Sequence, residues 1–463
     1  MAFKYTEDQL NKMDKALLIE LFLGLQDQME EPEELELKKG SRRKQGKKDQ
    51  DLSGLSVRRI DHYLSEQELE DEFGENGWKQ LPDMISRQYC FVPVKVEIEE
   101  HHIGVYADKK DEHMVRAPHP KVLLHGSLVS PSLGAAVMNG KYVNAVPLYR
   151  LEKEFERYGL AISRANMANW MIRLSEEYLS VFYDHLHRKI YDFDVIGADE
   201  TPVEVNKDGR PVGSKSYIWV YCSGGISSTH HIVLYEYQKT RNASHPVRFL
   251  KDYEGICVTD GYQVYHSAEK TLEHVTIAGC WVHVRRYFDE ALKIIPQAVR
   301  SKSWGYLVMK QIQAIYWEEG KLKHLKTEER LKQRQLVIKP LVDALFAYAK
   351  QHQVSVGTQG KLARAVTYLL NQEKYLRVFL ENGEVPMDNN ASERAIRGAE
   401  NSAIIYSIAE TAKANDLKPY EYFEYLLTEI PKHMEDTDRS FLDDLLPWSE
   451  KLPKEIKKTN KRS

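Results

Sequence analysis

Two short apolar segments that each end in an aspartate constrain the fold most. Residues 195–198 form one apolar run, which is followed by Asp199, and residues 255–259 form another, which is followed by Asp260. Runs of this length and composition predict buried strands of an α/β sheet. Ligands gather at the carboxyl ends of strands in open α/β sheets, so we expect both carboxylates at one functional rim.

The segments around these two runs complete the expected α/β pattern. Residues 217–221, 231–235 and 275–278 read as further strands. The chain then becomes mostly helical over residues 286–382, and a third carboxylate, Glu393, opens a later helix. Alternation along the first strand predicts that Glu200 points away from Asp199.

Convergent carboxylates without His or Cys partners are hard oxygen ligands that suit Mg²⁺ or Mn²⁺. Two such ions about 3.5–4 Å apart can clamp the attacking and leaving oxygens of a phosphoryl transfer. Structural alternatives stay open, because an aspartate after a strand is also a common turn residue. Glu393 can instead complete a capping box with Asn390 or pair with Arg397 one helical turn later.

A helix-turn-helix outline precedes the strands. Residues 148–158 are followed by Gly159, a helix terminator, and Ser163 is a suitable N-cap for a second helix over residues 164–174. Any helical hairpin has the same outline.

Asn and Arg side chains on the second helix favour DNA contact. Asn166, Asn169 and Arg173 share one face, and these residue types suit base edges. The inward face is expected to comprise Ala165, Ala168 and Ile172.

Charge is segregated at the two ends of the chain. Residues 1–36 carry three Lys and ten Asp or Glu, a net of −7, whereas residues 38–48 carry seven Lys or Arg and no acid, a net of +7. Residues 451–463 hold six basic residues and one Glu. Such runs are either solvated linkers or a basic arm that neutralises DNA phosphates. Residues 7–30 predict an amphipathic helix, which buries its apolar stripe in a coiled coil or against its own body.

Composition narrows the class of protein. The 463 residues suggest several domains, and the apolar runs are far shorter than the roughly 20 residues of a membrane span. The N-terminus has no apolar signal segment, and the four Cys are scattered, so we expect a reducing cytoplasm. Residues 89–106 predict a pair of strands, and the spacing of the nearby His residues matches no metal-ligand frame.

Several longer motifs carry a resemblance to a known family. ADETPVEV (198–205), VTDGYQVYH (258–266), GCWVHVRRYFDEA (279–291), MDNNASERAIR (387–397) and AIIYSIAETAKANDLKPYEYFEYLL (403–427) occur in this order. Together with NGKYVNAVPLYRLEKEFERYG (139–159), they resemble transposases of the insertion sequence 66 family, a DDE-class group of bacterial mobile elements.

The resemblance implies a ribonuclease-H-like catalytic core with a large all-helical insertion. The Asp-Asp-Glu triad maps onto Asp199, Asp260 and Glu393, which would hold Mg²⁺ or Mn²⁺. The motif from Cys280 has a less defined role, in which His283 and Arg286 contact phosphates or pack in the core. The remaining implied neighbours of the metal site or of DNA are Asn389, Asn390, Arg394 and Arg397.

The family also implies partners and a location. These are element-end and target DNA, self-association, two small accessory proteins of the same element, and no membrane. The protein would act in the bacterial cytoplasm, at the nucleoid.

The predicted layout follows from these patterns. It comprises an amphipathic helix (1–30), a charged linker (31–56), a small strand-containing module (57–125), a helical DNA-binding region (126–190), a catalytic domain (191–400) with a helical insertion at about 289–385, and a C-terminal helical segment with a basic tail (401–463).

Two departures from the family pattern bear on activity. Cys pairs of a zinc-binding segment are absent from residues 65–110, so we expect no structural zinc. A stretch with an Arg-Lys-Asn motif, usual after the catalytic glutamate, is missing after Arg397. The predicted function is therefore a DDE transposase, with a DNA-binding remnant that lacks catalysis as the alternative and a plain nuclease as a third possibility.

Overall fold

The computed structural model describes residues 67, 96–107, 114–117, 121–205, 209–211, 213–356, 359–389 and 400–458. The chain divides into two units, Met1–Ser65 and Glu66–Ser463. The first unit holds the predicted N-terminal helix and the charged linker, and it lies outside the described residues. The fold below is that of the second unit.

The strands and helices of this unit are, in chain order, β1 (Val105–Ala107), β2 (Met114–Arg116), α4 (Pro131–Met138), α5 (Leu148–Arg157), α6 (Arg164–Leu174), α7 (Ser180–Lys189), β3 (Val195–Glu204), β4 (Lys215–Ser223), β5 (Val233–Gln238), α8 (Ser244–Phe249), β6 (Gly255–Thr259), α9 (Gln263–Glu269), β7 (Val275–Gly279), α10 (Trp281–Lys293), α11 (Gln297–Arg300), α12 (Trp304–Lys321), α13 (Thr327–Gln333), α14 (Lys339–Val356), α15 (Lys361–Asn371), α16 (Glu373–Leu376), α18 (Glu400–Ala414), α19 (Pro419–Glu429) and α20 (Phe441–Asp444).

A five-stranded mixed sheet lies at the centre of the unit, in the order β5-β4-β3-β6-β7. The hairpin strands β3, β4 and β5 pair antiparallel, whereas β6 and β7 run parallel to β3. Parallel neighbours need a crossover connection, and α8 and α9 lie in the two connections that reach β6 and β7. The fold is therefore mixed α/β, as the sequence predicted.

The predicted strands are confirmed, but β4 is longer than the predicted 217–221, and β5 begins two residues after the start of the predicted 231–235. β6 has the predicted bounds, but β3 does not end before Asp199 and continues to Glu204. The reason is pairing, because β4 bonds to β3 along its whole length, from Ile196 opposite Ser223 to Glu204 opposite Lys215. The parallel ladder to β6 stops earlier, at Gly197 opposite Val258.

Residues 89–95 of the predicted strand pair lie outside the described part of the chain, and the rest of the pair is placed differently. Residues 96–104 are not in a strand, and the pair that forms is β1 with β2, with Tyr106 opposite Val115. Alternation of apolar and polar residues favours a strand only where a partner of matching register exists.

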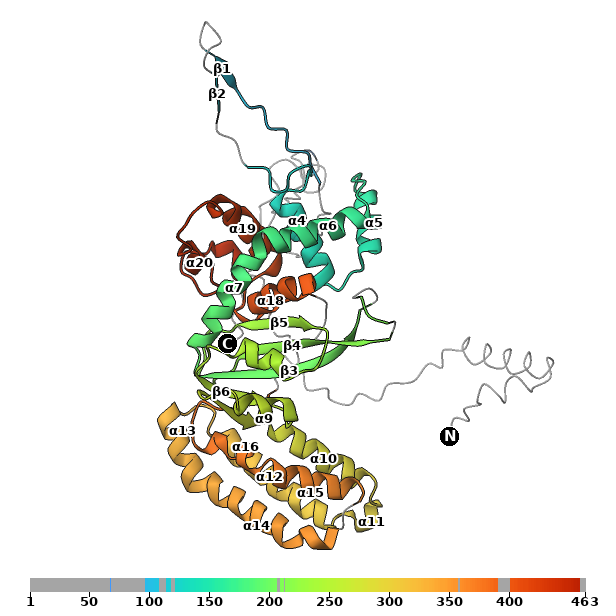
Figure 1. Ribbon diagram of the computed structural model, residues 1–463, viewed down its shortest axis with the longest axis vertical. Helices are drawn as coiled ribbons and strands as arrows, with labels where there is room; N and C mark the ends of the chain where they lie inside the picture. The colour runs from blue at the N-terminus through green and yellow to red at the C-terminus, as the bar shows by residue number, and fades with distance from the viewer. Residues whose placement is uncertain are drawn as a thin grey trace, which may run out of the picture. The chain divides into compact units, whose positions relative to one another are not determined.

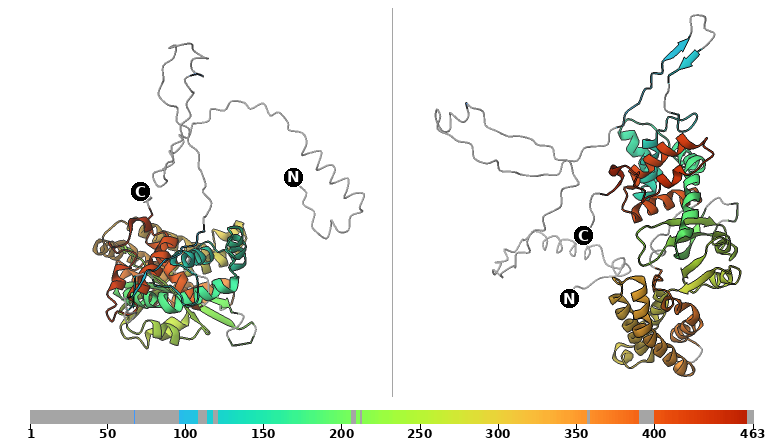
Figure 2. Two further views of the ribbon diagram at one scale, coloured as in Figure 1. Left: turned by 90° about the horizontal axis from the view of Figure 1, so that it is seen from above. Right: turned by 90° about the vertical axis from the view of Figure 1, so that its left-hand side faces the viewer.

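Three hydrophobic clusters pack around the sheet, and the smallest joins Ile218 and Val220 of β4 to Ala403 of α18. The largest cluster joins Ile196, Ala198 and Cys257 to helices from two parts of the chain. These are α6 and α7, which precede the strands in the sequence, and α19, which follows them. The second joins Val195, Val258 and Ala278 to α10, α12, α14 and α15. In Figures 1 and 2, α12 to α16 extend beyond the β6 side of the sheet, whereas α18 and α19 lie on the β5 side. A membrane crossing would need a longer or more apolar helix than any in the described part of the chain.

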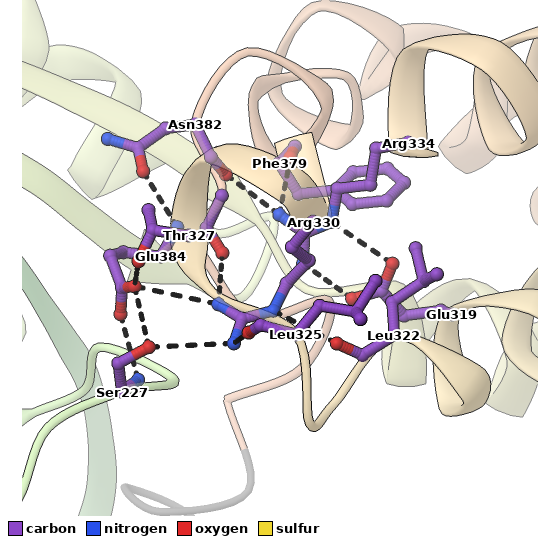
Figure 3. Close-up of polar contacts among 11 residues, drawn as sticks. Ser227, Glu319, Leu322, Leu325, Thr327, Arg330, Arg334, Phe379, Asn382 and Glu384 are labelled. Atoms are coloured by element: carbon purple, nitrogen blue, oxygen red, sulfur yellow. Dashed lines mark hydrogen bonds and ion pairs between the residues drawn. The ribbon is translucent and has the colours of Figure 1, made fainter. Parts of the chain in front are cut away.

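Buried Arg330 fastens the helical insertion to the loop between β4 and β5, whereas buried Arg334 bonds within the insertion (Figure 3). Arg330 donates to the carbonyls of Gly383 and Leu325, at 2.7 Å each, and its guanidinium lies 3.5 Å from Glu384. Glu384 accepts hydrogen bonds from the Ser227 backbone N–H and hydroxyl, both 2.8 Å, in the loop between β4 and β5. Burial opposes ionisation of Glu384, but bonds from Thr327 and Ser227 outweigh it and lower its pKa.

Candidate active site

Asp199 lies in β3, and Asp260 directly follows β6, the parallel neighbour of β3. Residue 195 pairs with 256 and residue 197 with 258, so the same register, carried on two residues past the last pair, would bring Asp199 beside Asp260. Parallel neighbours lie about 4.8 Å apart, and side chains two residues apart share a face. Val195 and Val258 face the helical insertion, and strand alternation would put both aspartates on that same face.

Local hydrogen bonds orient both carboxylates. The backbone N–H of Glu200 donates to Asp199 Oδ1 at 2.9 Å, and that of Tyr262 donates to Asp260 Oδ1 at 3.0 Å. Both side chains are half-buried. Each carboxylate is thus held by its own loop or strand while its residue keeps partial access to solvent.

Glu200 points to the opposite face, as alternation predicted. Its carboxylate is ion-paired with Arg241 and accepts a hydrogen bond of 2.7 Å from Tyr265 Oη on α9. Burial raises the pKa of Glu200, and the negative charge of Asp260 raises it further. The hydrogen bonds from Tyr265 and Arg241 lower the pKa but do not cancel this increase. Arg241 also stacks 3.6 Å from the centroid of Tyr262. Glu200 therefore braces the sheet behind the candidate site.

The segment that leads toward Glu393 is fastened to the same edge of the sheet. The backbone N–H of Trp281 donates to the Met387 carbonyl at 2.8 Å, and the backbone N–H of Asn389 donates to Cys280 Sγ at 3.2 Å. Asn389 is 4% exposed, and its side-chain Nδ2 donates to the carbonyl of Ala198, the residue before Asp199, at 2.8 Å. Asn389 thus ties the segment directly to the strand that carries Asp199.

The helical insertion contacts the Asp260 loop from the other side. The Gly261 N–H donates to Tyr368 Oη of α15 at 3.1 Å. Burial and the negative charge of Asp260 raise the pKa of Tyr368, so its phenol stays neutral.

The donor set fits a hard divalent cation. Asp199 and Asp260 supply carboxylate oxygens on one face, which is the chemistry that Mg²⁺ and Mn²⁺ prefer. Within the described ranges, no group of three or more His, Cys, Asp and Glu residues is placed to hold a metal ion. A third protein ligand would have to come from residues outside those ranges, where Glu393 lies.

The comparison with known protein families identifies the chain's relatives. Residues 126–415 match the family described as "Transposase IS66 family", which is more than half of the chain. The chain belongs to the IS66 transposase family. Residues 407–448, from α18 to beyond α20, match the IS66 C-terminal element.

Curated relatives of this IS66 chain come from Sinorhizobium fredii (strain NBRC 101917 / NGR234). The uncharacterized protein y4qI is 27% identical over 392 residues, which are 79% of this chain and 70% of y4qI. The uncharacterized protein y4jD is 25% identical over 362 residues, or 73% of this chain and 69% of y4jD. Among solved structures, the Mos1 transposase paired-end complex with left transposon end is similar at 13% identity. That match covers 54% of this chain and 79% of the Mos1 chain, with a TM-score of 0.14.

The predicted helical hairpin is present within the region matched by the IS66 family. Gly159, at φ +82°, follows α5, and the Ser163 hydroxyl accepts a hydrogen bond of 3.1 Å from the Asn166 N–H at the start of α6. The predicted inward face of α6 is wrong, because the buried residues are Met167, Met171 and Leu174. Both sets recur every three to four residues, and the set with the larger side chains buries more apolar surface.

The three predicted DNA contacts of α6 differ in their surroundings. Asn166 and Asn169 are exposed, whereas Arg173 pairs with Glu177 at 2.9 Å and donates to the His125 carbonyl at 3.2 Å. All three line a groove of about 580 Å³, whose other walls come from the 126–128 loop, α4 and the α5–α6 turn.

The two predicted contacts on α10 are also unlike each other. His283 is 8% exposed and lies in the core, whereas Arg286 is exposed. The positive charge of Arg286 partly offsets the raised pKa of Tyr368 on α15.

The remaining predicted site residues, Asn390, Glu393, Arg394 and Arg397, lie outside the described residues, as does most of the region where the zinc prediction falls. Sequence reasoning missed Tyr368 and Arg241. Neither stands in a recognisable motif, so only the tertiary structure relates them to the candidate site.

Proposed function

We propose that the chain is a DDE transposase whose ribonuclease-H-like core cuts and joins DNA strands with divalent metal ions. The single observation that supports this proposal is the pairing of Gly197 with Val258 in the parallel strands β3 and β6, two residues before Asp199 and Asp260. The sheet order, with three antiparallel strands followed by two parallel ones, supports the ribonuclease-H-like assignment.

Glu393 is proposed as the third carboxylate. Asn389 is tied to Ala198 beside Asp199, and four residues span at most about 14 Å. Ten residues after Glu393, Ala403 is buried against Ile218 and Val220 of β4. The chain is thus fastened to the sheet on both sides of Glu393, which supports its assignment to this site.

The proposed mechanism assigns separate tasks to the protein's groups. Asp199, Asp260 and Glu393 would hold the ions, which when bound activate the attacking hydroxyl and stabilise the leaving oxygen. The N–H groups of Glu200 and Tyr262 fix one oxygen of each aspartate. The Glu200–Arg241 pair on the far side keeps β3 in place, so the carboxylates need little reorganisation when the ions bind.

DNA contacts are proposed for exposed residues. Asn166 and Asn169 on α6 suit base edges, and Arg286 on α10 suits a phosphate near Asp260. Arg173 would have to exchange its pair with Glu177 for a DNA contact. The same proposal includes Asn390, Arg394 and Arg397, self-association and two accessory proteins of the element.

Asp199→Asn and Asp260→Asn test the catalytic assignment. Each variant removes one negative charge without changing size, so we expect Mg²⁺-dependent cutting of element-end DNA to be lost while DNA binding persists. The measurements are cleavage on a denaturing gel and binding by fluorescence anisotropy. Cutting at the wild-type rate by either variant would exclude the assignment. Strand-transfer products separate a transposase from a plain nuclease.

A DNA-binding remnant is the second candidate. The observation that favours it is that α18 begins at Glu400, only three residues after Arg397 in the sequence. The family's Arg-Lys-Asn stretch is therefore absent between Arg397 and this helix. The test compares this chain with a version in which that stretch is restored. Cutting by the restored version alone would establish the remnant.

A further inference from the structure

Tyr368 joins the helical insertion to the residue that follows Asp260. The Gly261 N–H donates to Tyr368 Oη at 3.1 Å, although the two residues are 107 positions apart in the chain. Tyr368 therefore holds the backbone of the loop that follows Asp260.

A second observation is the close packing at Gly261. A Cβ atom there would lie 2.6 Å from Tyr368 Oη and 2.9 Å from Gln372 Cδ, which is too close for any side chain without movement. The loop thus rests directly on α15, and its position is set by the insertion as well as by the sheet.

Neighbouring contacts extend the same interface along α9. The ring of His266 stacks on Tyr375 of α16, with centroids 3.9 Å apart and planes 3° from parallel. Glu269 at the end of α9 pairs with Lys374 at 2.9 Å. Three consecutive contacts therefore hold the segment from Gly261 to Glu269 against α15 and α16.

We propose that Tyr368 is a positioning residue, which holds the Asp260 loop against the insertion so that the Asp260 carboxylate stays beside Asp199 for the divalent ion. The inference rests on the proposed function, and it assigns the helical insertion a role in ordering the metal site. Groups that orient metal ligands without binding the metal contribute about 10–100-fold to affinity. Because Tyr368 acts through the backbone, we expect the lower end of that range.

Tyr368→Phe is the decisive variant. It removes the hydroxyl acceptor but keeps the ring, whose centroid lies 4.7 Å from that of Tyr287. We expect the full chain to bind Mn²⁺ about tenfold more weakly, measured by the electron paramagnetic resonance signal of free Mn²⁺. Cleavage should need more Mn²⁺ but approach the wild-type rate at saturation. A purely structural role would lower the melting temperature without this change in Mn²⁺ dependence.

Tyr422→Phe is the matched control, because Tyr422 Oη donates to the Leu445 carbonyl at 2.6 Å among the C-terminal helices. It loses a comparable hydrogen bond, and its Mn²⁺ affinity should stay at the wild-type value. Equal Mn²⁺ affinity of Tyr368→Phe and wild type, or an equal loss in the control, overturns the positioning role. Asp260→Asn distinguishes a failure of the positioning role of Tyr368 from a failure of the proposed function. If it also binds Mn²⁺ like the wild type, the proposed function itself fails.

Discussion

The buried ion pair between Arg334 and Glu319 allows the loss of unfolding free energy on its removal to be predicted. Arg334 is 0% exposed, and its guanidinium is bonded to both oxygens of the Glu319 carboxylate. It also donates to the carbonyls of Phe379 and Asn382, at 2.7 Å each, and so joins α12 to the last turns of the insertion.

Arg334→Met preserves much of the volume but leaves a buried carboxylate without its cation. Removal of one partner of a buried pair costs about 3–5 kcal/mol. The two carbonyls also lose donors, so we expect the upper half of that range. The free energy of unfolding in urea, followed by tryptophan fluorescence, measures the loss in the full chain.

Lys321→Met is the matched control, because Lys321 forms an exposed pair with Glu318 at 2.7 Å on the same helix. Exposed pairs contribute about 0–1 kcal/mol. The double variant Arg334→Met with Glu319→Leu should be less destabilised than Arg334→Met alone, since it removes the unpaired charge. A loss for Arg334→Met no larger than that of the control would refute the reasoning.

Three further predictions concern other parts of the unit. Asn389→Asp should impair both folding and cutting, because it places an acceptor against the Ala198 carbonyl, and thermal melting with a cleavage assay checks it. Gly383→Ala should destabilise by about 1–3 kcal/mol, since its Cβ would lie 2.2 Å from the Thr327 carbonyl oxygen, whereas Gly320→Ala on α12 meets no atom within 4 Å and should be neutral or stabilising. Burial lowers the pKa of His187 from the usual 6.5, so its contribution to stability is present above pH 6.5 and is lost as the pH falls through the lowered value. His187→Phe should therefore lose less stability between about pH 7.5 and about pH 5 in urea unfolding.

Local sequence signals predicted the elements whose ends are set locally. The bounds of β6 and the Ser163 cap of α6 agree with the structure because an apolar run and a capping hydroxyl act within a few residues. The predicted orientation of Glu200 away from Asp199 is confirmed for the same reason, since alternation follows from strand geometry.

The sequence-based predictions were wrong where a partner distant in the sequence decides the bounds of a strand or the buried face of a helix. β3 extends to Glu204 because β4 pairs with it, and nothing within residues 195–204 reveals that partner. On α6, the choice of Met167, Met171 and Leu174 as the buried face depends on which helices pack there.

The candidate site divides in the same way. Asp199 and Asp260 could be proposed from the apolar runs that precede them, but the register of β3 and β6 is a property of the sheet. The bond from Gly261 to Tyr368 joins residues 107 positions apart, so no sequence pattern predicts it. Glu393 stays a prediction, because it lies outside the described residues.

A crystal of the full chain grown with Mn²⁺ tests the central claim most directly, through the anomalous scattering of the ion. The account predicts a Mn²⁺ peak within coordination distance of both the Asp199 and Asp260 carboxylates, with Glu393 as a further ligand. A structure at saturating Mn²⁺ in which the ion binds elsewhere, or in which the two aspartates face apart, would contradict it.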